Sequence, residues 1–326
     1  MTNNEDNEMK LTTKITLAGC LIASSLSCIA EEKKDTRSFK TTQVAPGLYM
    51  IAGVGGFTGG NIGLSTGVDG VVMIDDSMPP LLGRMKDAIS SITPKPVDFL
   101  INTHVHGDHT GNNEAMGKSG TRIVAHENLR LRMVNKGVMT SNGDVPAPKA
   151  ALPVITFSHS MNFHLNDQDA KIFHVSEAHT DGDAVIYFKQ ANVIHTGDTM
   201  FSNMFPFIDF NNGGSLDGYI EAQKTIYKLA NDKTKIIPGH GELATKADLK
   251  NSIEMLKESK KIIAELVAKG KSEEEIVALN PLAKFHDKWN WGFITTEKMT
   301  RQVYKGIKAS GKKKHKHHKK EKDHSH

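Results

Sequence analysis

Cysteine is nearly absent from this 326-residue chain, and its two cysteines, Cys20 and Cys28, both lie near the N-terminus. They fall within an apolar run, residues 15–30, that follows two lysines and is too short to span a bilayer as a helix. This pattern is typical of a secretory signal peptide over residues 1–30, so we expect a periplasmic or secreted protein. The mature chain would then contain no cysteine, which excludes structural disulfides and thiolate metal ligands.

The same N-terminal run leaves one alternative open. The segment LAGC at Leu17–Cys20 looks like a lipidation site, so a lipoprotein anchor is possible in place of simple secretion. No other segment predicts a specific membrane partner, and the oligomeric state is not indicated by any pattern.

The chain has almost no net charge outside residues 311–326. The chain carries +4 in total, but residues 311–326 hold seven lysines against one Glu and one Asp, a net of +5, which leaves −1 for the rest. A nearly neutral body gives no electrostatic reason to expect nucleic acid as a partner. Residues 311–326 contain no apolar side chain, so we expect a disordered Lys/His-rich tail that either binds metal loosely or only solubilises the chain.

Short apolar strands and amphipathic helices alternate along the rest of the chain. Buried strands are predicted at residues 69–75, 97–102, 121–126, 183–188, 192–198 and 235–240, and helices at 79–92 and 216–230. Residues 131–153, with Gly, Asn and three prolines, are expected to be irregular. Strands mixed with helices favour an α/β fold with two sheets flanked by helices. Helical spacing at 246–268, 273–279 and 296–308 predicts a C-terminal helical extension over residues 246–310.

The strongest chemical signal is the segment His104-Val-His106-Gly-Asp108-His109, which directly follows a predicted strand. Imidazole and carboxylate groups are ligands that suit zinc. Four such groups within six residues can hardly all reach one small ion, so the spacing favours two adjacent metal sites. Two zinc ions need about six to eight ligand positions in total.

Three further residues share the same local setting. His179, Asp198 and His240 each lie on a short glycine-containing turn after an apolar run. Such turns place side chains on loops at the edge of a sheet. We therefore predict that these three residues join His104, His106, Asp108 and His109 around two zinc ions.

Other residues have a weaker claim to a functional role. His195 is either a partner of a metal ligand or, more simply, a buried structural residue, and His164 and His174 look like sheet residues. Asp75 and Asp76 follow a strand, and one of them is expected to hydrogen-bond the loop that carries His104 to His109, which we call the metal loop. Aromatic residues that could line the site, or simply pack in the core, are Phe57, Met204, Phe205, Phe207, Trp289 and Trp291.

The segments THVHGDHTG, AHTDGD, HTGDTMF and PGHG, in this order, resemble the metallo-β-lactamase superfamily. The resemblance covers about residues 44–245 and implies a four-layer αββα sandwich, so we take residues 31–245 as the catalytic domain. It further implies that His104, His106 and His179 hold one metal, that Asp108, His109 and His240 hold the other, and that Asp198 bridges them. The activity implied is zinc-dependent hydrolysis of a small carboxylic acid derivative (lactam, lactone, ester or thioester), with a metal-bridging hydroxide attacking the carbonyl. Asp108, His104 and His106 are the catalytic candidates.

Departures from known branches leave alternatives open. A β-lactamase proper is one of them, although one group of these enzymes has Cys at the position of Asp198 and a lysine soon after, whereas here Thr199, Met200 and Phe201 follow. A mononuclear iron oxidoreductase of the sulfur-dioxygenase type is another, and would use a subset such as His104, His179 and Asp198. A metal-scavenging protein that acts through its tail is the third.

Overall fold

The computed structural model describes residues 35–140 and 143–323, and residues 36–323 of these belong to one compact unit. The predicted signal peptide, with both cysteines, lies outside the described residues, so export remains a prediction. Among the helices that are described, none combines the length and the apolar character needed to cross a bilayer.

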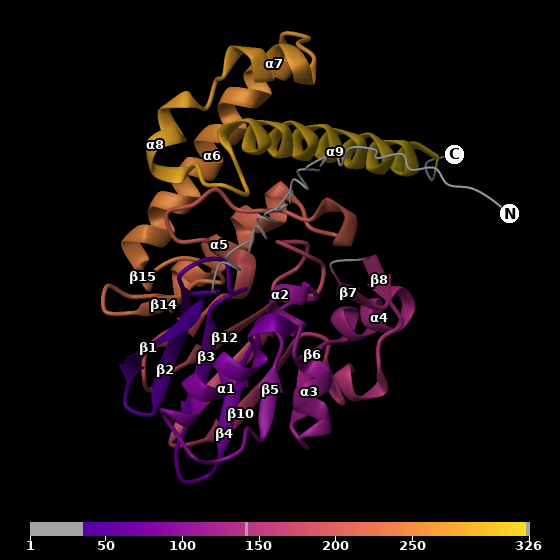
Figure 1. Ribbon diagram of the computed structural model, residues 1–326. Helices are drawn as coiled ribbons and strands as arrows, with labels where there is room; N and C mark the ends of the chain where they lie inside the picture. The colour runs from indigo at the N-terminus through magenta and orange to yellow at the C-terminus, as the bar shows by residue number, and fades with distance from the viewer. Residues whose placement is uncertain (1–34, 141–142, 324–326) are drawn as a thin grey trace, which may run out of the picture. The chain divides into compact units, whose positions relative to one another are not determined.

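Two sheets form the centre of the molecule (Figure 1). The first has seven strands in the order β1-β2-β3-β4-β5-β6-β9, antiparallel from β1 to β4 and parallel from β4 to β9. Its strands are β1 (Ser38–Ala45), β2 (Leu48–Val54), β3 (Ile62–Thr66), β4 (Val71–Ile74), β5 (Phe99–Ile101), β6 (Arg122–His126) and β9 (Ile155–Phe157).

The second sheet has six strands in sequential order, antiparallel except for the parallel pair β13 and β14. Its strands are β10 (Ser160–Leu165), β11 (Gln168–His174), β12 (Ala184–Phe188), β13 (Val193–His195), β14 (Lys235–Ile237) and β15 (Ala244–Thr245). A separate pair, β7 (Val138–Thr140) and β8 (Gly143–Val145), forms a small hairpin.

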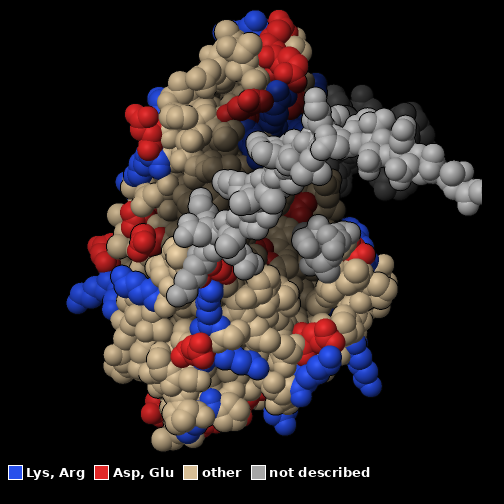
Figure 2. Space-filling view, in the orientation of Figure 1, with Lys and Arg blue, Asp and Glu red and all other residues tan. Residues whose placement is uncertain are grey.

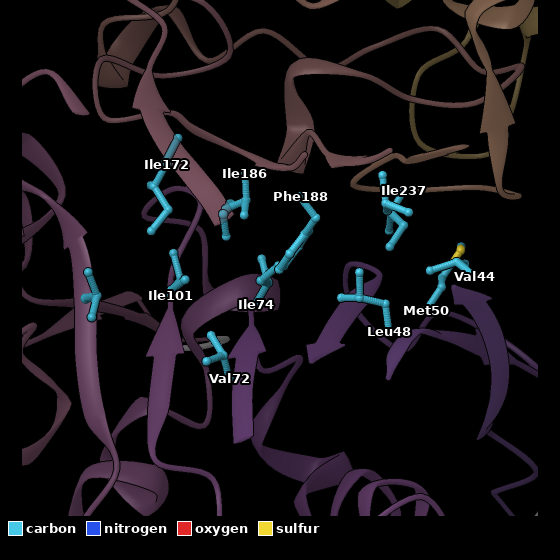
Figure 3. Packing of buried hydrophobic residues seen from close by; sticks show 14 of the residues in the cluster. Val44, Leu48, Met50, Val72, Ile74, Ile101, Ile172, Ile186, Phe188 and Ile237 are labelled. Atoms are coloured by element: carbon cyan, nitrogen blue, oxygen red, sulfur yellow. The ribbon is translucent and has the colours of Figure 1, made fainter. Parts of the chain in front are cut away.

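The main core lies between the two sheets (Figure 3). Ile74 and Ile101 from the first sheet face Ile186 and Phe188 from the second, and all four are buried. The central strands of the first sheet read as continuous apolar runs such as VVMI in β4 because helices cover their other face.

Helices cover the outer face of each sheet. On the first sheet, α1 (Leu82–Ser90) and α3 (Asn113–Lys118) place Met85, Ile89 and Met116 in a second core cluster. On the second sheet, α5 (Leu216–Leu229) and α6 (Lys246–Ala268) bury Ile226 and Leu249 in a third. The expected αββα sandwich is confirmed.

The C-terminal helices share a core with the sandwich. Helix α6, α7 (Glu273–Leu279), α8 (His286–Trp289) and α9 (Thr296–Asp323) lie at the end of the sheets where α2 (Gly107–Thr110) is drawn (Figure 1). Phe205 and Tyr219 of the sandwich pack in one buried cluster with Leu256 of α6 and Val303 of α9. Capping boxes at Thr245 and Ser272 fix the first turns of α6 and α7.

The structure differs from the expected elements at three places. Helix α9 continues to Asp323, through most of the segment 311–326 expected to be disordered, because lysine is a good helix former and no proline interrupts the run. Helix α4 (Glu127–Lys136) begins a stretch expected to be irregular, and β7 and β8 lie within it. Strand β1 was not expected, since most of its side chains are exposed and its pattern lacks a clear apolar face.

Short 3-10 helices complete the chain: η1 (Pro79–Leu81), η2 (Lys149–Ala151), η3 (Gly197–Thr199), η4 (Phe210–Asn212) and η5 (Ala283–Phe285). On the face shown in Figure 2, basic and acidic side chains lie side by side over the surface.

Candidate metal centre

All seven predicted ligands come together at one end of the two sheets. His104 and His106 follow β5, and Asp108 and His109 lie on the short helix α2 that comes next. From the second sheet, His179 follows β11, Asp198 lies on η3 after β13, and His240 follows β14. Every one is buried except Asp108, which is partly exposed.

The seven side chains divide into two groups whose ligand atoms converge. His104, His106, His179 and Asp198 form the first group, and Asp108, His109 and His240 form the second. Within each group the ligand atoms lie within 4.8 Å of one another. In the first group, His179 Nε2 is 2.9 Å from His106 Nδ1, and in the second, His109 Nε2 is 3.3 Å from His240 Nε2.

Asp198 stands between the groups with one oxygen directed at each. Its Oδ2 lies 3.7 Å from His104 Nε2 and 3.4 Å from His179 Nε2. Its Oδ1 lies 3.1 Å from His109 Nε2 and 3.4 Å from His240 Nε2. A single carboxylate in this position can bridge two ions.

Hydrogen bonds on the far side of three imidazoles decide which nitrogen faces the centre. His106 Nε2 is 2.8 Å from Asp209 Oδ2, so its Nδ1 points inward. His109 Nδ1 is 2.7 Å from Asp75 Oδ2, and His179 Nδ1 donates to the Phe207 carbonyl oxygen at 2.8 Å. Such outer partners orient metal-binding imidazoles and raise their basicity.

Asp75 confirms the expectation that one acidic residue after β4 holds the metal loop. Besides His109, it accepts 2.7 Å hydrogen bonds from the Thr103 amide and the Thr103 hydroxyl. It adopts a left-handed backbone conformation with φ of 59°, which is uncommon outside glycine and typical of functional sites. Asp76 lies beside it and holds α3 by accepting from the Asn112 amide.

Burial keeps two imidazoles of the first group, those of His104 and His179, neutral. It lowers the pKa of His179 to about 4, although Asp198 opposes the shift. Burial also holds the pKa of His104 well below its usual value, and the nearby His109 adds to the effect. Neutral imidazoles have free lone pairs, so this group is ready to bind a cation.

Carboxylates dominate the second group. Burial would lower the pKa of His240, but Asp198 and Asp108 outweigh it and raise that pKa to about 9. The same carboxylates overcome burial at His109 and raise its pKa. Burial would raise the pKa of Asp108, yet His109 and His240 lower it to about 2. In the metal-free protein these imidazoles therefore hold protons that a metal must displace.

Two glycines leave room for the ligands. A side chain at Gly60 would place its Cβ 2.0 Å from His109 Cε1, and one at Gly239 would place it 2.0 Å from Asp198 Oδ1. Asn61, next to Gly60, joins the two sheets. Its backbone amide donates to the Gly239 carbonyl at 2.7 Å, and its side-chain amide donates to the carbonyls of Pro238 and Gly241.

Three other histidines discussed above, His195, His164 and His174, do not join the centre. His195 is buried in β13, where its Nε2 donates to the Asn61 carbonyl oxygen at 3.1 Å, so the structural interpretation holds. His164 is exposed and pairs with Asp169. His174 stacks on His126 with ring centroids 3.9 Å apart. Of the predicted wall residues, Phe205 and Trp289 are core residues, whereas Phe57 and Phe207 contact the ligand imidazoles.

Zinc fits this set of residues on two grounds. His104 Nε2 and Asp198 Oδ1 are buried and lack any hydrogen bond of good geometry, which is costly unless something else satisfies them. The donors are imidazole nitrogens and carboxylate oxygens, the set that zinc prefers when thiolates are absent. Both orphaned atoms point into the centre described above.

Comparisons with known proteins agree with the geometry. A family model described as the metallo-beta-lactamase superfamily matches residues 55–240. The chain is 29% identical over 146 residues to a hydroxyacylglutathione hydrolase of Pelagibacter ubique, which covers 44% of this chain and only 51% of that protein. It is 22% identical over 234 residues to a metallo-beta-lactamase type 2 of Bacillus cereus, covering 69% of this chain and 85% of that one.

Solved structures show the same fold. A metallo-beta-lactamase from Pontibacter korlensis superposes with a TM-score of 0.55 at 16% identity, over 68% of this chain and 99% of that one. The sec-alkylsulfatase Pisa1 from Pseudomonas sp. gives 0.60 at 19% identity, over 82% of this chain and 50% of that one. The wider coverage indicates that the second likeness reaches into the C-terminal helices.

Proposed function

This chain belongs to the metallo-beta-lactamase superfamily, and on that premise we propose that it is a hydrolase that holds two zinc ions and cleaves a small carboxylic acid derivative. The observation that carries the proposal is Asp198, whose two oxygens are directed at two separate ligand groups. A mononuclear enzyme has no need of the second group, which Asp108, His109 and His240 complete. Relatives named as a hydroxyacylglutathione hydrolase and a metallo-beta-lactamase support a hydrolytic reaction.

The proposed roles follow from the geometry. His104, His106 and His179 would hold one zinc, Asp108, His109 and His240 the other, and Asp198 both. When bound, zinc supplies a hydroxide near neutral pH and polarises the carbonyl of the substrate. Asp108 is the most accessible carboxylate of the centre, with 21% of its side chain exposed against 4% for Asp198. Its low pKa keeps it ionised, so it can orient a water molecule by accepting a hydrogen bond from it.

Among carboxylic acid derivatives, we propose that β-lactams are poor substrates. The residues after Asp198 are Thr199, Met200 and Phe201, all of them buried, so this segment offers no cation for the carboxylate of a β-lactam. An ester, thioester or lactone needs no such anchor.

The test combines metal analysis with a hydrolysis panel. Protein purified without chelator is expected to contain about two equivalents of zinc, and to hydrolyse an ester, thioester or lactone faster than a carbapenem. One equivalent of iron without zinc would favour the oxidoreductase alternative and reject the proposal.

Single substitutions locate the activity. His106→Ala and His240→Ala each remove a ligand from a different group, so each is expected to abolish nearly all turnover. His164→Ala is the matched control, since this exposed histidine lies on β10 and contacts Asp169 only at the surface. Wild-type turnover in His240→Ala would show that the second group has no part in the chemistry.

A further inference from the structure

A chain of aromatic rings connects the two ligand groups, which we call the aromatic arc: Phe57, Phe201, Phe207, Trp291 and Phe293. At one end Phe57 and Phe201 stack on His240, with ring centroids 5.9 Å and 5.0 Å away. At the other end Phe207 lies 5.8 Å from both His106 and His179.

The C-terminal extension closes the arc. Trp291 lies 6.0 Å from Phe201, Phe293 lies 5.7 Å from Trp291, and Phe207 lies 5.6 Å from Phe293. Trp291 and Phe293 come from the segment between α8 and α9, far in sequence from every ligand. The arc therefore runs from the second ligand group, through the extension, to the first.

Two members of the arc remain exposed in spite of their apolar rings. Phe57 is 54% exposed and Phe293 is 50% exposed, whereas Phe201 is only 3% exposed. Exposed aromatic rings that continue a buried aromatic surface beside a buried polar centre are a feature of ligand sites. Core packing does not require Phe57 or Phe293 to lie there.

Hydrogen bonds hold the exposed part of the arc in place. Trp291 Nε1 donates to the Phe205 carbonyl at 2.9 Å, and the Phe205 amide donates to the Trp289 carbonyl at 2.8 Å. Lys298 Nζ donates to the Phe293 carbonyl at 2.8 Å and lies 5.1 Å from the centre of its ring. These contacts present Phe293 in a defined position without using an imidazole or carboxylate of the centre.

We propose that the aromatic arc binds the apolar acyl group of an ester or thioester substrate, and that Phe293 sets the preference for acyl chain length. The inference rests on the proposed function and names its substrate class. An acyl chain lying on the rings would place its carbonyl next to the ligand groups that the arc connects.

The experiment measures kcat/KM of zinc-loaded protein for p-nitrophenyl acetate, butyrate and octanoate. In the wild type, kcat/KM is expected to rise about fourfold for each added methylene that lies on the rings. Phe293→Ala is expected to lower kcat/KM for octanoate about tenfold while leaving acetate nearly unchanged. The matched control is Leu279→Ala, which removes another exposed apolar side chain of the same extension, 53% exposed at the end of α7.

A binding measurement separates this inference from the proposed function. Calorimetry with 4-phenylbutan-2-one, which cannot be hydrolysed, is expected to show binding to the wild type and to Leu279→Ala, and weaker binding to Phe293→Ala. If no ester, thioester, lactone or lactam is cleaved, the proposed function fails while this result still decides the role of the arc. Equal chain-length profiles in the wild type and Phe293→Ala, or ketone binding unaffected by Phe293→Ala, would overturn the inference.

Discussion

Asp209 shows how a single residue outside the ligand set can tune the centre. Its carboxylate lies 2.8 Å from His106 Nε2 and is also bonded by the Asn212 side chain at 2.7 Å. Burial would raise the pKa of Asp209, but hydrogen bonds from His106 and Asn212 lower it, so the carboxylate is ionised. This ionised partner fixes the orientation of the His106 ring, so that its Nδ1 faces the centre.

We therefore expect Asp209→Asn to weaken zinc binding in the first group about 10- to 100-fold, because such outer partners contribute that much to metal affinity. The measurement is a zinc titration against a competing chelator. Asp169→Asn is a matched control, since Asp169 makes the same type of contact with His164 on the surface. Unchanged zinc affinity in Asp209→Asn would show that backbone packing alone orients His106.

The two ligand groups are expected to respond differently to pH. His240 has a pKa of about 9 in the metal-free protein, so below that pH a proton competes with the metal at the second group. His179 has a pKa of about 4, so it is already neutral at pH 6. Zinc affinity at the second group should rise about tenfold per pH unit for each displaced proton up to about pH 9, whereas at the first group it should change little.

Calorimetry in buffers of different ionisation enthalpy counts the protons that each zinc releases at pH 7. The expected result is more protons for the second, weaker equivalent than for the first. Equal proton release by both equivalents would contradict the assignment of protonated imidazoles to the second group.

At the scale of elements, helix α6 depends on its capping box. The Thr245 hydroxyl accepts from the Asp248 amide, and the Asp248 carboxylate accepts from the Thr245 amide at 2.9 Å. Thr245→Ala leaves the Asp248 amide without its side-chain acceptor, so the free energy of unfolding in urea should fall by about 1 kcal/mol. Thr245→Ser keeps the hydroxyl and should remain close to the wild type. A loss equal to that of Thr245→Ala would instead implicate the methyl group.

The sequence predicted the elements whose pattern is local and regular. Strand β4 is an uninterrupted apolar run, and α6 has a clear apolar face, so both were expected. Strand β1 was not predicted from the sequence, because an edge strand with one solvated face has few apolar residues in its pattern. Helix α4 was not predicted because its N-cap residue is His126 and not one of the usual capping residues. The His126 ring accepts a hydrogen bond from the Asn128 amide.

The same contrast holds within the metal centre. His104, His106, Asp108 and His109 were predictable because they lie within one six-residue segment. Asp209 and Phe293 were not, because their roles arise from contacts across the fold with His106 and Phe207. The aspartate after a strand, Asp75, carried a partial signal, and the structure confirms its contact with the metal loop.

At the scale of the whole molecule, the C-terminal helices are part of the fold. Removing residues 246–326 would expose Phe205, Ile208 and Tyr219, which are fully or almost fully buried against α6 and α9. We expect that truncated protein to aggregate, because an apolar surface of this kind does not persist in water. Soluble expression followed by circular dichroism is the measurement.

The matched truncation removes only residues 312–326. The apolar side chains of α9 that pack in the described core lie at or before Ile307, so this shorter deletion should leave the melting temperature unchanged. A soluble, folded 1–245 fragment would contradict the shared core.

Each ligand group draws on both sheets: His104 and His106 come from the first and His179 from the second, while His109 is matched by His240. Neither ligand group is complete until the sheets have met, so we expect a metal ion to stabilise the folded state more than the early steps of folding. Once bound, it fastens one sheet to the other beside the hydrogen bonds of Asn61. We therefore expect a bound metal ion to slow unfolding rather than to speed folding. In a metal-poor compartment we expect the protein to fold at nearly the same rate as with metal, but to unfold faster.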